Sequence, residues 1–256
     1  MPSIEVPGGR VFVRDLNPEG DDPIVMIHGL LTNHTVFLKA GAFDLAKRHR
    51  VTMYDLRGHG LTDLVPTDFR LTTIAEDLFI LMDALGIAHA DLVGYSFGAA
   101  TAIQASLTDP ARIGRLALIE PFGLSRDQLP THDTGVRDGV AAYSRSTSVV
   151  VSTRRENQLE DQLSSLFTDH GLVESLQGDA DFFTRAPLDR LTHPVLVLSG
   201  KSSPYCKDAE LVAKRLPHAT LMRTRGDHNL PVTRSGWVRR RLIRWGKEAA
   251  RGDQRP

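Results

Sequence analysis

One serine in this chain has the local sequence of an exposed nucleophile. Residues 94–98 read Gly-Tyr-Ser-Phe-Gly, with the apolar run 90–93 before them and an alanine-rich, helix-forming stretch after them. Glycines on both sides let the backbone bend tightly where a strand turns into a helix, and such a bend lifts the hydroxyl clear of the sheet. The motif is short and also arises by chance in turns, so the rest of the chain must support it. Ser96 is the candidate nucleophile.

A serine hydroxyl is a weak nucleophile at neutral pH, so the chain must also supply a base and an acid. In such sites a histidine takes the proton, and a carboxylate fixes the tautomer of that histidine and stabilises its imidazolium form. Residues 226–230 read Gly-Asp-His-Asn-Leu and follow the last strand-like run, just before a helix that we expect to begin near Thr233. We therefore expect His228 to be the base.

Three segments in the first half of the chain together resemble the α/β-hydrolase family. The apolar run 23–27 ends in His-Gly, the run 51–54 is followed by DLRGHGLTD, and the Gly-Tyr-Ser-Phe-Gly turn comes next. Members of the family carry an HG turn, a D-x-R-G-x-G-x-S/T-D loop and the nucleophile turn in this order. The resemblance is close over residues 4–121 and looser over 191–245.

The resemblance also implies the surroundings of the nucleophile. The backbone N–H groups of Leu30 and Phe97 would form an oxyanion hole, which stabilises the charge that develops on the carbonyl oxygen during acyl transfer. The family uses the histidines at the positions of His28 and His59 structurally. His34 and Tyr95 are the residues that we expect to contact substrate.

The acid is the position at which this sequence departs from the family. Relatives usually carry an aspartate soon after the seventh strand, but here the run 195–200 is followed by Lys-Ser-Ser-Pro and the expected position holds Ser203. Glu120 directly follows the sixth strand, where some family members carry their acid, and strands six and seven are neighbours. Asp208 lies further into the later loop and could instead be a charge at a helix N-terminus. We favour Glu120 and keep Asp208 as the alternative.

Apolar, strand-like runs alternate with helical patterns along most of the chain. The strand-like runs are 24–28, 51–55, 91–95, 115–120, 194–199 and 219–223, residues 1–14 suggest a short strand pair, and the clearest helix pattern covers 72–85. Such alternation is typical of a parallel sheet with helices on both faces, which binds ligands at the carboxyl ends of its strands. The predicted fold class is therefore α/β: a mostly parallel eight-stranded sheet of the α/β-hydrolase type.

Residues 122–190 interrupt this alternation with polar, helix-compatible sequence. In the family, an insertion after the sixth strand is commonly a helical cap over the site. We therefore expect residues 1–121 and 191–256 to form the core and 122–190 to form a helical cap.

Composition narrows the class of partner. The 31 Lys and Arg residues balance 31 Asp and Glu residues, so no net charge favours nucleic acid or an anionic membrane. The single cysteine, Cys206, excludes an internal disulfide and a cysteine-rich metal site. No apolar run is long enough to span a bilayer, and no cluster has metal-ligand spacing. We expect a cytoplasmic protein that acts on a small-molecule acyl substrate without metal or cofactor.

Together these features predict a serine hydrolase that cleaves an ester, thioester, lactone or similar acyl bond through a Ser-His-Glu triad and an acyl-enzyme. The alternative is a non-hydrolytic protein of the same fold: a cofactor-free oxygenase, an isomerase or cyclase, or a ligand-binding protein. The missing aspartate after the seventh strand raises this possibility and keeps the alternative open. A serine rather than an aspartate at the nucleophile position argues against dehalogenation.

Overall fold

The computed structural model describes residues 3–6, 8–64, 68–146 and 153–252 of the chain. Within these residues one sheet has the strand order β1-β2-β4-β3-β6-β7-β8-β9, and a short β5 pairs with β2. The strands are β1 (Ser3–Val6), β2 (Gly9–Leu16), β3 (Asp21–Ile27), β4 (His49–Tyr54), β5 (Asp63–Leu64), β6 (Ala90–Tyr95), β7 (Ile113–Ile119), β8 (Val195–Gly200) and β9 (Ala219–Thr224).

The sheet confirms the predicted mostly parallel architecture. The pairs β3·β4, β3·β6, β6·β7, β7·β8 and β8·β9 are parallel, whereas β2 runs antiparallel to its neighbours β1, β4 and β5. The six apolar runs correspond to β3, β4 and β6–β9, and the strand pair expected near the N-terminus is β1 and β2. The two-residue β5 was not predicted.

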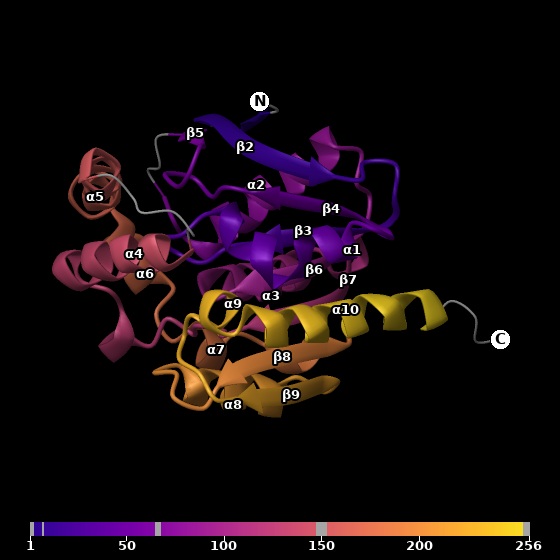
Figure 1. Ribbon diagram of the computed structural model, residues 1–256. Helices are drawn as coiled ribbons and strands as arrows, with labels where there is room; N and C mark the ends of the chain where they lie inside the picture. The colour runs from indigo at the N-terminus through magenta and orange to yellow at the C-terminus, as the bar shows by residue number, and fades with distance from the viewer. Residues whose placement is uncertain (1–2, 7, 65–67, 147–152, 253–256) are drawn as a thin grey trace.

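Helices cover both faces of this sheet (Figure 1). The helix predicted over 72–85 is α2, and the segment between β7 and β8 is helical as expected. The α-helices are α1 (Phe43–Leu45), α2 (Leu71–Ala84), α3 (Phe97–Thr108), α4 (His132–Ser146), α5 (Thr153–Thr168), α6 (Leu172–Gly178), α7 (Phe182–Arg185), α8 (Cys206–Arg215), α9 (Leu230–Thr233) and α10 (Ser235–Gly252). Short helical turns are η1 (His34–Phe37), η2 (Leu38–Ala42), η3 (Pro110–Arg112), η4 (Arg126–Gln128) and η5 (Leu188–Arg190).

Side chains of the central strands alternate between two separate apolar cores. In β3, Ile24 and Met26 belong to the core that includes residues of α10 and η2, whereas Val25 and Ile27 belong to the core with α2 and α3. This period of two follows from the pleat of a strand, which points successive side chains to opposite faces. All four side chains are fully buried, so the sheet is covered on both sides at its centre.

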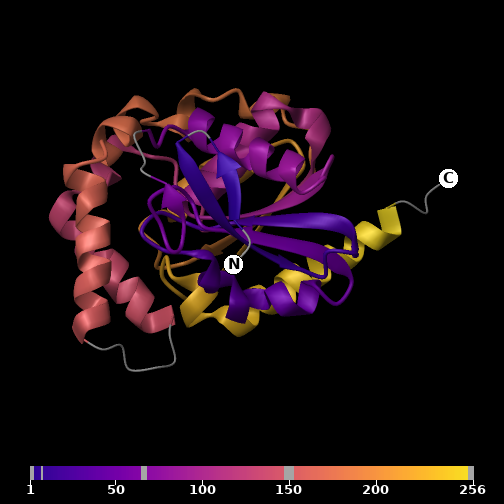
Figure 2. The same ribbon diagram turned by 90° about the horizontal axis from the view of Figure 1, so that it is seen from above.

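The helices between β7 and β8 lie together at one side of the molecule, where α4, α5 and α6 are neighbours (Figures 1 and 2). Because β7 and β8 are parallel neighbours, the chain leaves the carboxyl end of β7, forms these helices and returns to the amino end of β8. In the part of the chain that the structure describes, no helix is long and apolar enough to cross a membrane.

Candidate active site

The turn between β6 and α3 holds Ser96 in a strained backbone conformation. Its φ of 57° and ψ of −118° lie in a region that residues with a side chain adopt at a cost of about 1–3 kcal/mol. Backbone hydrogen bonds hold the turn, since Ser96 N donates to the carbonyl of Ile119 and Ser96 O accepts from Ala99, both at 2.9 Å. The turn therefore keeps Ser96 at the N-terminus of α3, just beyond the end of β6.

Glycines make room for this turn. A Cβ atom on Gly94 would collide with the backbone of Gly98, and one on Gly98 would collide with the carbonyl oxygen of Ile27. A Cβ atom on Gly29 would come within 2.9 Å of the Ser96 Cβ. Both glycines of the motif are thus required by close packing, and the turn after β3 lies directly against the serine.

His228 lies opposite the serine hydroxyl. Its Nε2 is 2.9 Å from Ser96 Oγ, at the end of a loop between β9 and α9. The Tyr95 hydroxyl donates to the carbonyl oxygen of His228 at 3.2 Å, and the Tyr95 ring stacks on the imidazole with 5.4 Å between centroids. The ring of Tyr205 meets the imidazole edge-on at 4.5 Å. These contacts orient the imidazole toward the hydroxyl.

Glu120 faces the other nitrogen of this histidine. It is the first residue after β7, has a φ of 51° and is 1% exposed. Its Oε1 accepts from the amide of Gly200, and its Oε2 lies 3.5 Å from His228 Nδ1. Within the described residues neither Oε2 nor Nδ1 has a hydrogen-bond partner elsewhere. The separation exceeds an ordinary hydrogen bond, and such contacts commonly tighten only when substrate binds.

Asp208, the alternative acid, makes a different contact. It lies in the first turn of α8, is 7% exposed, and its Oδ2 accepts from the amide of Gly123 at 2.7 Å. Burial raises the pKa of Asp208 above its ordinary value, although the hydrogen bond from Gly123 opposes this. Among the described contacts, no hydrogen bond or ion pair joins Asp208 to His228. The geometry brings Glu120, and not Asp208, to the histidine.

A cavity of about 330 Å³ borders Ser96 and His228. The turn after β3 and the loops after β7, β8 and β9 form part of its wall, and the β7–β8 segment adds Pro130, Gly135 and Gly139. Tyr95 lines the cavity, and its contact with substrate stays a prediction. Tyr205 also lines it and was not predicted, although its position in the loop after β8 placed it at the carboxyl edge of the sheet.

Phe97 and Leu30, the two predicted oxyanion donors, lie in the turns next to Ser96. Phe97 is the first residue of α3, and the amides of a first helical turn have no partner within the helix. Leu30 lines the cavity and follows Gly29, which packs against the Ser96 Cβ. Ser96 therefore lies at the N-terminus of α3, the positive end of the helix dipole, and the role of the Leu30 and Phe97 amides as an oxyanion hole stays a prediction.

Comparison with known proteins decides the family. Residues 22–170 match the family model described as the alpha/beta hydrolase fold. The chain belongs to the α/β-hydrolase fold family.

Two curated relatives and one solved structure show how far the likeness extends. The 3-oxoadipate enol-lactonase 1 of Acinetobacter baylyi is 26% identical over 207 residues, which cover 77% of each protein. The dihydrolipoyllysine-residue acetyltransferase component of the acetoin cleaving system of Pseudomonas putida is 30% identical over 174 residues, 65% of this chain, and the chain spans 41% of that protein. The structure of the meta-cleavage product hydrolase from Pseudomonas fluorescens is 19% identical, with a TM-score of 0.77 over 97% of this chain and 98% of that one.

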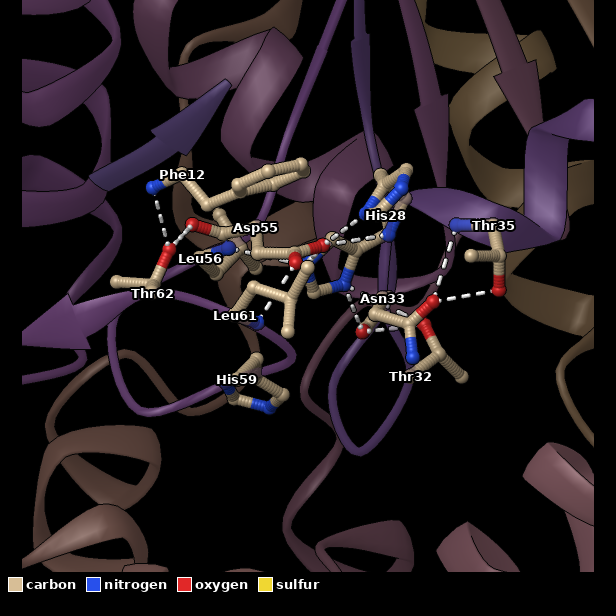
Figure 3. A network of polar contacts seen from close by, with 12 residues as sticks. Phe12, His28, Thr32, Asn33, Thr35, Asp55, Leu56, His59, Leu61 and Thr62 are labelled. Carbon is tan, nitrogen blue, oxygen red and sulfur yellow. Dashed lines mark hydrogen bonds and ion pairs between the residues drawn. The ribbon is translucent and has the colours of Figure 1, made fainter. Parts of the chain in front are cut away.

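A second polar network of this α/β-hydrolase fold surrounds Asp55, at the end of β4 (Figure 3). Asp55 Oδ1 accepts from the amide of His34 at 2.7 Å and lies 2.8 Å from His34 Nδ1, while Oδ2 accepts from the amide of Leu61 at 2.9 Å. Burial alone would raise the pKa of Asp55, but His34 and the neighbouring His28 outweigh it and hold this pKa below its ordinary value. The carboxylate therefore ties η1 to the loop after β4.

The expected substrate contact of His34 is corrected by this network. The His34 side chain is buried against Asp55 and the ring of Phe12, and His34 is not among the residues that line the cavity. The hydrogen bond to Asp55 holds the His34 imidazole outside the wall of the cavity, where the sequence had suggested a contact with substrate.

His28 and His59 use both ring nitrogens to join backbone segments. His28 Nδ1 donates to the carbonyl of Gly29 at 2.7 Å, and its Nε2 accepts from the amide of Leu56 at 2.9 Å. His59 donates to a carbonyl of its own loop at 2.7 Å and accepts from the amide of Leu31 at 2.9 Å. Burial lowers the pKa of His28 to about 3 and also lowers the pKa of His59. Both rings are therefore neutral structural links between the turn after β3 and the loop after β4.

In the described ranges no group of three or more His, Cys, Asp or Glu side chains could hold a metal ion.

Proposed function

We propose that this chain is a serine hydrolase that cleaves an ester, thioester, lactone or similar acyl bond of a small molecule. The observation that carries the proposal is the 2.9 Å separation between Ser96 Oγ and His228 Nε2 at the wall of a cavity. A hydroxyl held against an imidazole loses its proton as it attacks a carbonyl carbon. The enol-lactonase among the relatives supports a hydrolytic reaction on an acyl oxygen bond.

The proposed reaction has two halves. Ser96 Oγ bonds to the carbonyl carbon while His228 Nε2 takes its proton, and the amides of Leu30 and Phe97 hold the oxyanion. The imidazolium then gives this proton to the leaving group, which departs and leaves an acyl-enzyme. A water molecule, deprotonated by the same Nε2, attacks the acyl carbon, and the collapse of the second oxyanion releases the acid and restores the serine.

Glu120 has the role of a positioning and stabilising acid in this proposal. A carboxylate opposite Nδ1 favours the tautomer that carries its proton there, which leaves Nε2 as the acceptor for the serine proton. The amide of Gly200 holds the other carboxylate oxygen, Oε1, which leaves Oε2 facing Nδ1 of the histidine. Residues 122–190 act as the cap, a role supported by Pro130, Gly135 and Gly139 in the cavity wall.

A fluorophosphonate probe tests the proposal, because it phosphonylates a serine only where a base activates the hydroxyl. The native protein should be labelled, and Ser96→Ala should not. Ser203→Ala is the matched control, since Ser203 lies in the loop after β8, where Tyr205 N donates to its hydroxyl, and does not contact His228. An unlabelled native protein would contradict the proposal and favour the non-hydrolytic alternative.

A further inference from the structure

The active-site cavity has almost no charge in its wall. The described residues that line it include the uncharged polar side chains of Thr32, Tyr95, Tyr205 and Asn229, and none of them is a lysine or an arginine. The remaining lining residues apart from the candidate catalytic pair are apolar or glycine, with one exception. That exception is Asp227, whose side chain ends in a carboxylate.

Asp227 places a carboxylate group at the edge of the site. It is exposed, precedes His228 in the chain, and its Oδ1 accepts from the amide of Asn229 at 3.0 Å and the hydroxyl of Thr233 at 3.3 Å. Neither donor is a cation, and the ion pairs of the described residues do not include Asp227. A carboxylate on a substrate would therefore meet a like charge, and the described residues that line the cavity offer it no guanidinium or ammonium group as a partner.

One feature of the site, the predicted oxyanion hole, does favour negative charge. In the proposed reaction the substrate carbonyl oxygen occupies it, so it is not free to bind a carboxylate elsewhere on the substrate. In that reaction the amides of Phe97, at the N-terminus of α3, and of Leu30 hold the oxygen of the substrate carbonyl. The rest of a substrate would lie against the mostly apolar wall. The cavity volume of about 330 Å³ is at the small end of the range for ligand sites, which suits a short acyl group.

We propose that the site selects small, uncharged acyl substrates and discriminates against those that carry a carboxylate, with Asp227 as the residue that sets this selection. The inference rests on the proposed function, since it names the substrate class of the same site. Binding and turnover can nevertheless be measured separately.

Two esters that differ by one group provide the test: phenyl butyrate, and monophenyl succinate, in which a carboxylate replaces the terminal methyl group. Binding to the Ser96→Ala variant is measured by calorimetry, so that neither ester is consumed. At low ionic strength phenyl butyrate should bind about tenfold more tightly, and the ratio should shrink in 0.5 M salt, because salt screens the repulsion between exposed charges. A purely steric preference would not respond to salt.

Variants in the same Ser96→Ala background assign the effect to one residue. Asp227→Asn should bring the binding ratio close to one, and Asp227→Glu should retain it. Glu19→Gln is the matched control: it removes one exposed negative charge in the turn between β2 and β3, at the end of β3 opposite the serine, and should leave the ratio unchanged.

The outcomes separate the two proposals. Equal binding of the two esters, or a ratio that Asp227→Asn does not alter, would overturn the inference even if the native protein hydrolyses phenyl butyrate. Selective binding without any hydrolysis by the native protein would instead contradict the serine hydrolase proposal and support the charge selection.

Discussion

Two histidine-bearing regions lie at the carboxyl edge of the same sheet and use the same side chain differently. In the turn after β3 and the loop after β4, His28 and His59 each engage backbone groups with both ring nitrogens. In the loop after β9, His228 presents one nitrogen to Ser96 and the other to Glu120. The difference shows that the partners of the two ring nitrogens, more than burial, distinguish a structural histidine from a candidate base.

The carboxylates of the two regions differ in the same way. Both oxygens of Asp55 accept hydrogen bonds from His34 and Leu61, so no lone carboxylate oxygen is left to act on a reacting group. Glu120 commits Oε1 to Gly200 and leaves Oε2 for the histidine. The first region joins loops, and the second has the geometry to move a proton.

Alanine substitutions should separate the two regions most sharply. His228→Ala should lower kcat/KM for a short-chain ester by about 10⁴-fold or more, because no other group is placed to take the serine proton. The same change should alter the free energy of unfolding by less than about 1 kcal/mol. His28→Ala should instead lower that free energy by about 2–4 kcal/mol, since it removes a fully buried ring, leaves the amide of Leu56 unpaired and takes one of two donors from the carbonyl of Gly29. Urea titrations and initial rates measure both, and a stability loss confined to His228→Ala would break the comparison.

Substitution of the two buried acids, Glu120 and Asp208, should have the next largest difference in effect on kcat. Glu120→Gln keeps the shape but cannot stabilise the imidazolium, so kcat should fall by roughly 10²- to 10⁴-fold. Asp208→Asn leaves a group that can still accept from Gly123, so kcat should stay within about threefold of the native value. Steady-state rates with one saturating ester decide between them. The reverse ranking would transfer the acid role to Asp208.

Acid titration should distinguish the histidines through stability. The folded-state pKa of His28 is about 3, below its ordinary value of 6.5, so the unfolded chain binds the extra proton between these values. The stabilisation is therefore fully present above pH 6.5 and is lost as the pH falls, by up to about 1.4 kcal/mol per pH unit for this one group. His28→Gln should reduce the slope of unfolding free energy against pH between 6.5 and 5, measured by urea titration. An unchanged slope would mean that His28 is not buried in its neutral form.

The smallest effect concerns the loop that carries the base. Tyr95→Phe keeps the ring stacked on the imidazole but removes the hydrogen bond to the carbonyl of His228. One neutral hydrogen bond contributes about 1 kcal/mol, so kcat/KM should fall by about two- to fivefold. Tyr95→Leu, which also removes the stacked ring, should cost more. A loss above about a hundredfold for Tyr95→Phe would show a direct role of the hydroxyl in the reaction.

The strand positions were predictable because buried parallel strands read as continuous apolar runs. The run 24–28 became β3 and the run 115–120 became β7, each within a few residues. The two-residue β5 has no such pattern, since its pairing with β2 depends on backbone groups brought close by the fold. Local sequence patterns therefore predict those strands whose own side chains are buried in the core.

The site was predictable in part. The serine and the histidine came from short motifs at strand ends, and the structure brings their reacting atoms together. The sequence favours Glu120 as the acid but leaves Asp208 open, because both follow neighbouring strands and the direction of each side chain depends on the fold. The prediction for His34 failed for the same reason, because its side chain turns toward Asp55, which lies 21 residues away in the chain. The direction of a side chain depends on tertiary contacts, and the spacing of residues in the sequence does not reveal them.

The central claim is that His228 activates Ser96, and the rate of fluorophosphonate labelling measures this activation directly. The native protein should be labelled on the peptide that contains Ser96, at a rate about a hundredfold or more above that of His228→Ala, because only the native imidazole can take the hydroxyl proton. Equal rates in the two proteins, or a label on another residue, would contradict the account.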